Sequence, residues 1–156
     1  MQFLQKFESE NGPKAIGPYS PAVKLGDFVY LSGQLGMDKD GNLVSDDVVE
    51  QTHQAMKNIG YLLDEMGLHY RHVVKTTVFV ADLNDFGKVN EVYGSYFDGV
   101  YPARSCVEVA RLPKDAKVEI ECIVLDTLVY EQQMEAHQCG SGCGDGCSDG
   151  CCGGCQ

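Results

Sequence analysis

The stretch AVKLGDFVYLSGQL, Ala22 to Leu35, breaks at Gly26 and Asp27 and predicts two short strands joined by a tight turn. Within it the tetrapeptide FVYL at 28–31 is apolar on both faces of the strand, as is VFV at 78–80. A half-exposed strand would instead alternate between apolar and polar residues. Both faces of the predicted sheet must therefore be covered.

The region from Asp46 to Met66 predicts a long helix, because its apolar residues recur at helical spacing. Ser45 is the expected N-cap, and Asp46 and Asp47 complement the helix dipole. Gly67 can end the helix in the left-handed conformation.

Downstream, the pattern predicts strands over 72–81, 103–112 and 117–128, and a second helix over 85–97. This order predicts an α+β sheet with two helices. Two helices can cover only one face of such a sheet, so the second apolar face is expected to pack against other copies of the chain. The sequence therefore predicts a homo-oligomer.

The composition limits the classes of function. The chain has 156 residues, enough for one domain with a core, and no apolar run approaches the roughly 18 residues that span a bilayer. Its N-terminus lacks the basic and apolar regions of a signal peptide, so a cytoplasmic location is expected. Acidic residues outnumber basic ones by 23 to 12, giving a net charge of -11, which disfavours nucleic acid and anionic membranes as partners.

The C-terminus carries most of the thiols. Only Cys106 and Cys122 lie in the body of the chain, and the other cysteines crowd into the last eighteen residues. These are Cys139, Cys143, Cys147, Cys151, Cys152 and Cys155. Such a glycine-rich tail cannot build a core, but its thiolates could hold zinc, copper or iron; the alternatives are an unliganded tail or oxidation to disulfides. The expected division is a domain at 1–126, a polar spacer at 127–138 and the tail at 139–156.

Four segments, AIGPYSP (15–21), LSGQ (31–34), VKTTVFVADLNDF (74–86) and YPARSCVEVARLPKDAKVEIE (101–121), together resemble the RidA/YjgF family of enamine and imine deaminases. The resemblance extends over about residues 14 to 126. It implies a chorismate-mutase-like α+β fold and a homotrimer packed around a central barrel of sheets, with clefts between subunits. It also implies cofactor-independent hydrolysis of 2-aminoacrylate, 2-aminocrotonate and their imines to 2-keto acids and ammonia.

Arg104 and Glu119 are the candidate catalytic residues. A guanidinium offers a planar fork that can bind a substrate carboxylate, whereas the pattern of the strand alone would favour a surface ion pair. Alternation along the strand places Glu119 and Glu121 on one face, and their spacing cannot choose between them. The resemblance selects Glu119 as the residue that positions or activates water.

The resemblance also assigns cleft positions to Tyr19, Ser32, Gly33 and Asn90, although each alone would more often serve a turn or packing role. Cys106 lies two residues beyond Arg104, so it is expected on the same face, where the guanidinium would favour its thiolate. We expect Cys106 to line the pocket and to be sensitive to oxidation. The histidines show no metal-ligand spacing.

Two other functions compete with deamination. A trimer could bind small carboxylate or carbonyl metabolites without turnover, because a family fold does not guarantee catalysis. Nuclease activity, proposed for some relatives, is disfavoured by the acidic charge. Whether Arg104 and Glu119 meet within a subunit or across an interface is left open by the sequence.

Overall fold

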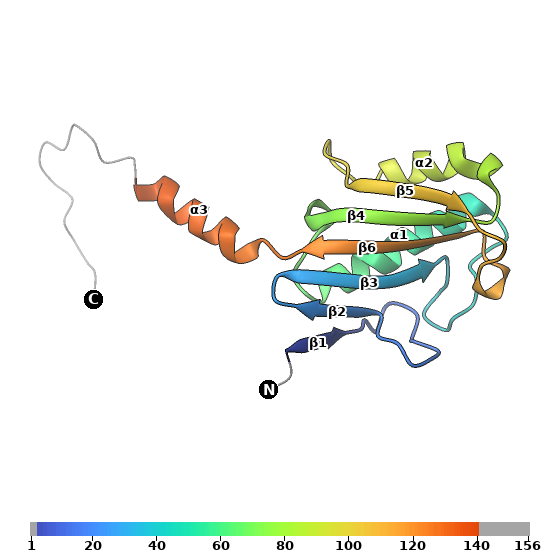
Figure 1. The fold of residues 1–156 in the computed structure, drawn as a ribbon, viewed down its shortest axis with the longest axis horizontal. Helices are drawn as coiled ribbons and strands as arrows, with labels where there is room; N and C mark the ends of the chain where they lie inside the picture. Colours follow the sequence, from blue (N-terminus) through green and yellow to red (C-terminus); the bar gives the residue numbers. More distant parts are fainter. Residues whose placement is uncertain (1–2, 141–156) are drawn as a thin grey trace, which may run out of the picture. The chain divides into compact units, whose positions relative to one another are not determined.

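The computed structural model describes residues 3–140 and divides into two units, one ending at Asp126 and the other beginning at Thr127. The first unit contains one sheet of six strands in the order β1-β2-β3-β6-β4-β5, with β4 and β5 parallel and all other neighbours antiparallel (Figure 1). The strands are β1 (Leu4–Phe7), β2 (Ala22–Leu25), β3 (Phe28–Leu35), β4 (Val73–Val80), β5 (Ala103–Glu108) and β6 (Val118–Leu125).

Helices α1 (Val48–Asp64) and α2 (Phe86–Gly94) contact each other and lie on the same side of the sheet (Figure 1). The central strand β6 shows how the sheet is oriented, because its side chains alternate between buried and less buried positions. Val118, Ile120, Cys122 and Val124 face the helices and form part of the core. The α+β fold with two helices on one face, predicted from the sequence, is confirmed for this unit.

Among residues 3–126, no α-helix packs on the opposite face of the sheet, here called the open face. Phe28 and Tyr30 of β3 are 51% and 46% exposed, while their neighbours Val29 and Leu31 are buried. The apolar run at 28–31 therefore supplies both a core face and an exposed face. That other copies of the chain cover the open face remains a prediction.

The start of α1 differs from the expectation that Ser45 caps it. The N-cap is Asp47, whose side chain accepts a hydrogen bond from the Val49 N–H at 3.2 Å. Ser45 lies two residues earlier, and its hydroxyl accepts from the Asp47 N–H at 2.8 Å. Ser45 thus shapes the turn that leads into the cap. Gly67 has φ +68°, which confirms the predicted left-handed position after the helix.

The ends of two other elements also differ from those predicted. Strand β5 ends at Glu108 rather than at residue 112, and α2 ends at Gly94 rather than at residue 97. Strand β1 is not predicted from the sequence, because its residues LQKF show no alternation that would mark a buried face.

The second unit contains helix α3 (Leu128–Gly140), which occupies most of the region expected to be a polar spacer and extends two residues into the expected tail. Just before it, the Thr127 hydroxyl donates a hydrogen bond to Oε1 of Glu131 at 2.7 Å. The proposed metal ligands in the tail, from Cys143 to Cys155, lie outside the described residues. Among the described helices, none is both long enough and apolar enough to cross a membrane.

Candidate functional site

Arg104 extends from β5 toward α2. Its register partner on β4 is Thr76, a residue on the helix-covered face of the sheet. Nη1 of Arg104 donates a hydrogen bond to Oδ1 of Asn90 at 2.6 Å. The guanidinium carbon lies 5.4 Å from the ring centre of Phe86 and 5.0 Å from that of Tyr93, within the range of cation–π attraction.

A cavity of about 400 Å³, here called the Arg104 pocket, opens beside this side chain. Its lining residues are Asn90, Tyr93, Gly94, Tyr101, Pro102 and Arg104. Within residues 3–140, no carboxylate lies at ion-pair distance from Arg104. The described part of the chain therefore contains no surface ion pair of Arg104, which was the competing explanation for this residue. A half-buried cation that faces a cavity without a counterion is suited to bind an anionic ligand.

Glu119 lines a second cavity, of about 370 Å³, here called the Glu119 pocket. Its lining residues are Ile16, Tyr19, Ser32, Gly33, Leu35, Met37, Pro113, Lys114 and Glu119. Burial raises the pKa of Glu119 above its usual value, and repulsion from Glu121 raises it further. The carboxyl is thereby shifted toward the pH range in which a general base operates.

Gly33 permits this placement of Glu119. The pairing of β3 with β6 shifts register between Leu31 and Gln34, so Gly33 lies at an irregularity in the strand. A Cβ atom at position 33 would lie 1.8 Å from Oε1 of Glu119. Only glycine therefore lets the carboxylate lie against the backbone of β3. The adjacent Ser32 hydroxyl donates to the Ser20 carbonyl at 2.7 Å and ties the loop before β2 to this wall.

The two pockets are separate within one chain. Arg104 extends on the helix-covered face, whereas Glu119 pairs with Phe79 and extends on the open face. The structure thus brings Asn90 together with Arg104, and it brings Tyr19, Ser32 and Gly33 together with Glu119. It does not bring Arg104 and Glu119 together.

Cys106 behaves differently from the expectation. It shares the strand face of Arg104, because its register partner Val78 is buried against the helices as Thr76 is. However, burial raises the pKa of its thiol more than the nearby Arg104 lowers it. The expected preference for the thiolate is therefore wrong. Cys106 is also absent from the lining of the Arg104 pocket.

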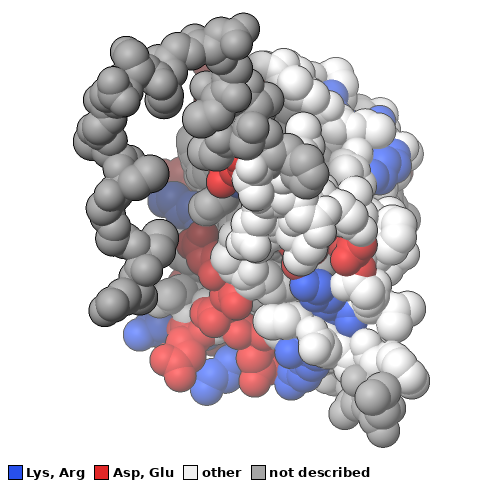
Figure 2. Space-filling view, turned by 90° about the vertical axis from the view of Figure 1, so that its left-hand side faces the viewer, with Lys and Arg blue, Asp and Glu red and all other residues white. Residues whose placement is uncertain are grey.

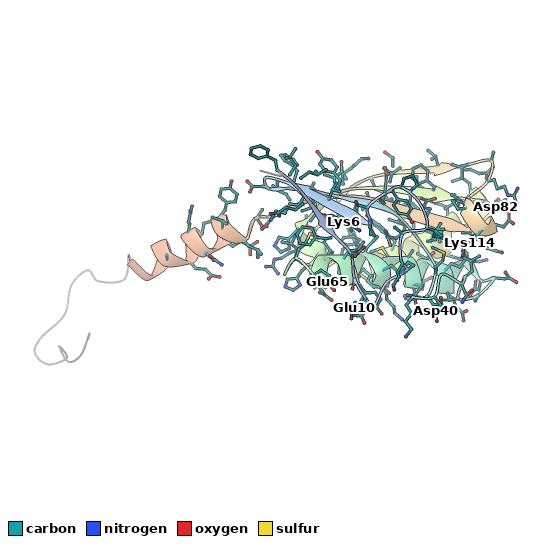
Figure 3. The ribbon with its side chains drawn as sticks, turned by 90° about the horizontal axis from the view of Figure 1, so that it is seen from below. Lys6, Glu10, Asp40, Glu65, Asp82 and Lys114 are labelled. Carbon is teal, nitrogen blue, oxygen red and sulfur yellow. The ribbon has the colours of Figure 1, made fainter. Side chains whose placement is uncertain are left out.

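Several lining residues were missed by sequence reasoning. Tyr93 lines the Arg104 pocket, and Phe86 lies beside the guanidinium without lining that pocket. The pattern at 85–97 predicts only an apolar helix, and the separation of these two residues by seven positions is the signal that they share one face of it. Lys114 lines the Glu119 pocket with φ +57°, followed by Asp115 with the same φ, both unusual for residues other than glycine. The Lys114 ammonium donates to the Gly41 carbonyl, and Figure 3 shows Lys114 and Asp40 at the same end of the sheet. The turn signal Pro113-Lys114-Asp115 could have indicated this wall.

The surface charge agrees with the composition. On the face seen in Figure 2, some described basic side chains lie beside acidic ones and others lie among uncharged residues, and they do not form a continuous patch. Among residues 3–140, no group of three or more His, Cys, Asp or Glu side chains is arranged to hold a metal ion.

Comparison with known proteins identifies close relatives. The family model described as "Endoribonuclease L-PSP" matches residues 9–126. The chain is 52% identical over 114 residues to a Mus musculus protein named 2-iminobutanoate/2-iminopropanoate deaminase, covering 72% of this chain and 84% of that protein. It is 49% identical over 120 residues to the Salmonella typhimurium protein of the same name, covering 75% and 94%.

Solved structures agree with these sequence matches. The structure described as the YjgF gene product from E. coli superposes with a TM-score of 0.74 at 46% identity, covering 78% of this chain and 98% of that one. The structure of E. coli TdcF with bound serine gives a TM-score of 0.74 at 43% identity, with the same coverage.

Proposed function

Because the chain belongs to the RidA/YjgF (Endoribonuclease L-PSP) family, we propose that it hydrolyses 2-imino and 2-enamine acids to 2-keto acids and ammonia. The observation that carries the proposal is Arg104, a half-buried cation beside a cavity with no carboxylate partner in the described chain. A 2-imino acid would supply the missing carboxylate. The names of the relatives support the same reaction.

In the proposed mechanism, Arg104 binds the substrate carboxylate and Glu119 accepts a proton from a water molecule as that water adds to C2. Addition to the C=N bond gives a carbinolamine. Glu119 returns that proton to the imine nitrogen, which completes the carbinolamine. A second transfer through Glu119 then moves the proton of the new hydroxyl group to the amino nitrogen, as the C=O bond forms and the C–N bond breaks, and ammonia and the 2-keto acid leave. Imine and water are consumed in equal amounts, and the reaction requires no redox partner.

The reaction needs Arg104 and Glu119 at one substrate, so we propose that each active site forms between two copies of the chain in a homotrimer. Two features support this proposal: the two residues extend from opposite faces of one sheet, and the open face carries exposed Phe28 and Tyr30. The open faces would line the central barrel of the trimer. The Arg104 pocket of one copy would then meet the Glu119 pocket of the next.

A mixing experiment tests the shared site. Chains carrying Arg104→Ala and chains carrying Glu119→Gln should each be nearly inactive. When they are refolded together, about a quarter of the sites in a randomly mixed closed ring should contain one intact Arg104 and one intact Glu119. Imine hydrolysis should recover to that fraction. If the mixture shows no more activity than the sum of its parents, the two residues act within one chain or not together.

The function itself is tested by generating 2-imino acids in situ and measuring release of ammonia and 2-keto acid. Purified protein should raise the rate well above spontaneous hydrolysis.

A second candidate, binding of small carboxylates without turnover, is favoured by the serine found in the relative TdcF. Saturable binding of a 2-keto acid with no rate increase would establish that candidate. Glu119 favours the enzyme, because a site made only to bind an anion gains nothing from a neighbouring carboxylate.

The description of the family model also names an endoribonuclease. The net charge of -11 would repel an RNA backbone, and the face in Figure 2 shows no continuous basic patch among the described residues. We therefore do not propose this activity for the chain.

The raised pKa of Glu119 predicts the pH dependence of the reaction. A general base must be ionised, so kcat/KM should fall as pH drops through the pKa of Glu119, starting at a higher pH than for an ordinary glutamate. Glu121→Gln removes one cause of the shift, and the acidic limb should move to lower pH. Ionisation of the substrate affects both proteins equally. Any difference between their pH profiles therefore comes from ionisable groups of the protein. A limb that stays in place or moves to higher pH would contradict the assignment of Glu119.

We further propose that the tail from Cys139 to Cys155 is a separable appendage that binds a soft metal ion. The family match ends at residue 126, well before the first of these cysteines. A chain cut after His137 should hydrolyse imines and assemble like the full chain. The full chain, purified anaerobically under reducing conditions, should contain zinc, copper or iron at a fixed ratio, and uptake should weaken as pH falls because thiols must lose protons to bind.

The matched control for the tail is a full-length chain with all six tail cysteines replaced by serine. Elemental analysis should find metal only in the unmodified chain. Equal metal content in all three proteins would exclude the tail as the ligand, and loss of assembly on truncation would show that it is not separable.

A further inference from the structure

The side chains that hold Arg104 come from one face of α2. Phe86, Asn90 and Tyr93 are spaced by four and three residues, so they line a single stripe of the helix. Asn90 accepts one hydrogen bond from the guanidinium, and the rings of Phe86 and Tyr93 lie close to its carbon atom. The orientation of the guanidinium therefore depends on where this stripe is held.

Tyr93 is itself fixed by a residue outside the pocket. The Tyr93 hydroxyl lies 2.8 Å from Oγ1 of Thr76, and the two side chains are 3% and 1% exposed. Thr76 is the register partner of Arg104 in the parallel pair β4–β5. One buried hydrogen bond thus connects the ring near the guanidinium to the strand position beside the Arg104 backbone.

The Thr76–Tyr93 bond lies in a buried environment. Burial raises the pKa of Tyr93, so its phenol stays neutral at physiological pH. Its ring centre lies 4.9 Å from that of the buried Phe97, which packs on it. Thr76 does not line the Arg104 pocket, so it can act on a ligand only through Tyr93 and Arg104.

We propose that Thr76 and Tyr93 are positioning residues for Arg104, and this rests on the proposed function. Their hydrogen bond holds the Tyr93 ring in place, and the ring, with Asn90, sets the plane of the guanidinium. One edge of the guanidinium is bound by Asn90, and the remaining N–H groups are then aligned for both oxygens of a 2-imino acid carboxylate. In this role Asn90 orients the arginine.

The test uses Thr76→Val, which keeps the shape of the side chain and removes its hydroxyl, and Thr76→Ser, which keeps the hydroxyl. The control is Val89→Ala, which removes buried volume from α2 at a residue that lines neither pocket. Two quantities are measured in the full-length protein. They are the dissociation constant of the unreactive ligand pyruvate and the rotation rate of the Arg104 guanidinium about its Cζ–Nε bond, by ¹⁵N NMR.

Thr76→Val should weaken pyruvate binding about tenfold, the typical effect of losing one aligned hydrogen bond, and should speed guanidinium rotation. Thr76→Ser should restore both quantities to within about twofold of the wild type. Val89→Ala should lower stability to urea and leave both quantities unchanged. Unchanged rotation in Thr76→Val, or an equal change in Val89→Ala, would overturn the proposal. If wild-type protein neither binds pyruvate nor hydrolyses imines, the proposed function fails, and the rotation rates still decide whether Thr76 positions Arg104.

Discussion

Replacing Arg104 with alanine should lower kcat/KM for 2-imino acid hydrolysis by about 30- to 800-fold, which corresponds to a loss on the order of 2–4 kcal/mol. The physical reason is that the substrate carboxylate loses its charged partner in a pocket where no other described cation is seen to line the cavity. Steady-state kinetics on imines generated in situ give this ratio. The fold should survive, because the side chain is only half-buried.

Arg104→Lys separates geometry from charge. Lysine keeps the positive charge but cannot bind two carboxylate oxygens in one plane, and it loses the planar contact with Phe86 and Tyr93. We expect it to be severely impaired. Size-exclusion chromatography should show unchanged assembly for both variants. Full activity in a correctly assembled Arg104→Ala protein would refute the role of Arg104.

Glu119→Gln should lower kcat by about 100-fold or more, while the dissociation constant of pyruvate changes only a few-fold. Glutamine keeps the shape of the side chain and can hydrogen-bond a water molecule, but it cannot accept a proton. Single-turnover kinetics and calorimetric titration with pyruvate provide the two measurements. The larger effect should therefore fall on chemistry and the smaller one on binding.

Glu121→Gln is the matched control, because Glu121 lies two residues along the same face of β6 and does not line the Glu119 pocket. At neutral pH its kcat should stay within a few-fold of the wild type. Equal losses of kcat and of pyruvate affinity in Glu119→Gln would show that Glu119 only shapes the pocket. Equal losses of kcat in the two variants would mean that the charge of the strand matters more than the position of Glu119.

Much of the fold could be predicted because the sequence patterns that indicate its strands and helices involve residues close together in the chain. The Gly26-Asp27 turn and the helical spacing in 46–66 each depend on residues close in sequence, and the structure has β2, β3 and α1 there. The end of β5 could not be predicted in this way. Val109 and Leu112 continue the strand pattern, but in the structure they pack in a small cluster with Met37 and Ala116 beside the 113–115 turn.

For the candidate site, the face on which each glutamate lies could be predicted, but the distance between the two candidate catalytic residues could not. Alternation along β6 placed Glu119 and Glu121 on one face, and the structure agrees. The separation of Arg104 from Glu119 could not be read from the sequence, because it depends on the register of β5 and β6 against the strand between them. Register is set by long-range pairing, and a shift of one residue would move every side chain to the other face.

The two faces of the sheet also affect how damaging mutations should be interpreted. Within one chain Arg104 and Glu119 extend from opposite faces of the sheet and line separate pockets. A substitution at Tyr30 on the open face would, under the proposed assembly, abolish turnover while leaving every reacting group chemically intact. In a genetic screen, such alleles would look like active-site lesions although Tyr30 lines neither the Arg104 pocket nor the Glu119 pocket. Only a mixed population of chains would tell the two kinds apart, since an intact neighbour can rescue a missing side chain but cannot rescue a lost contact surface.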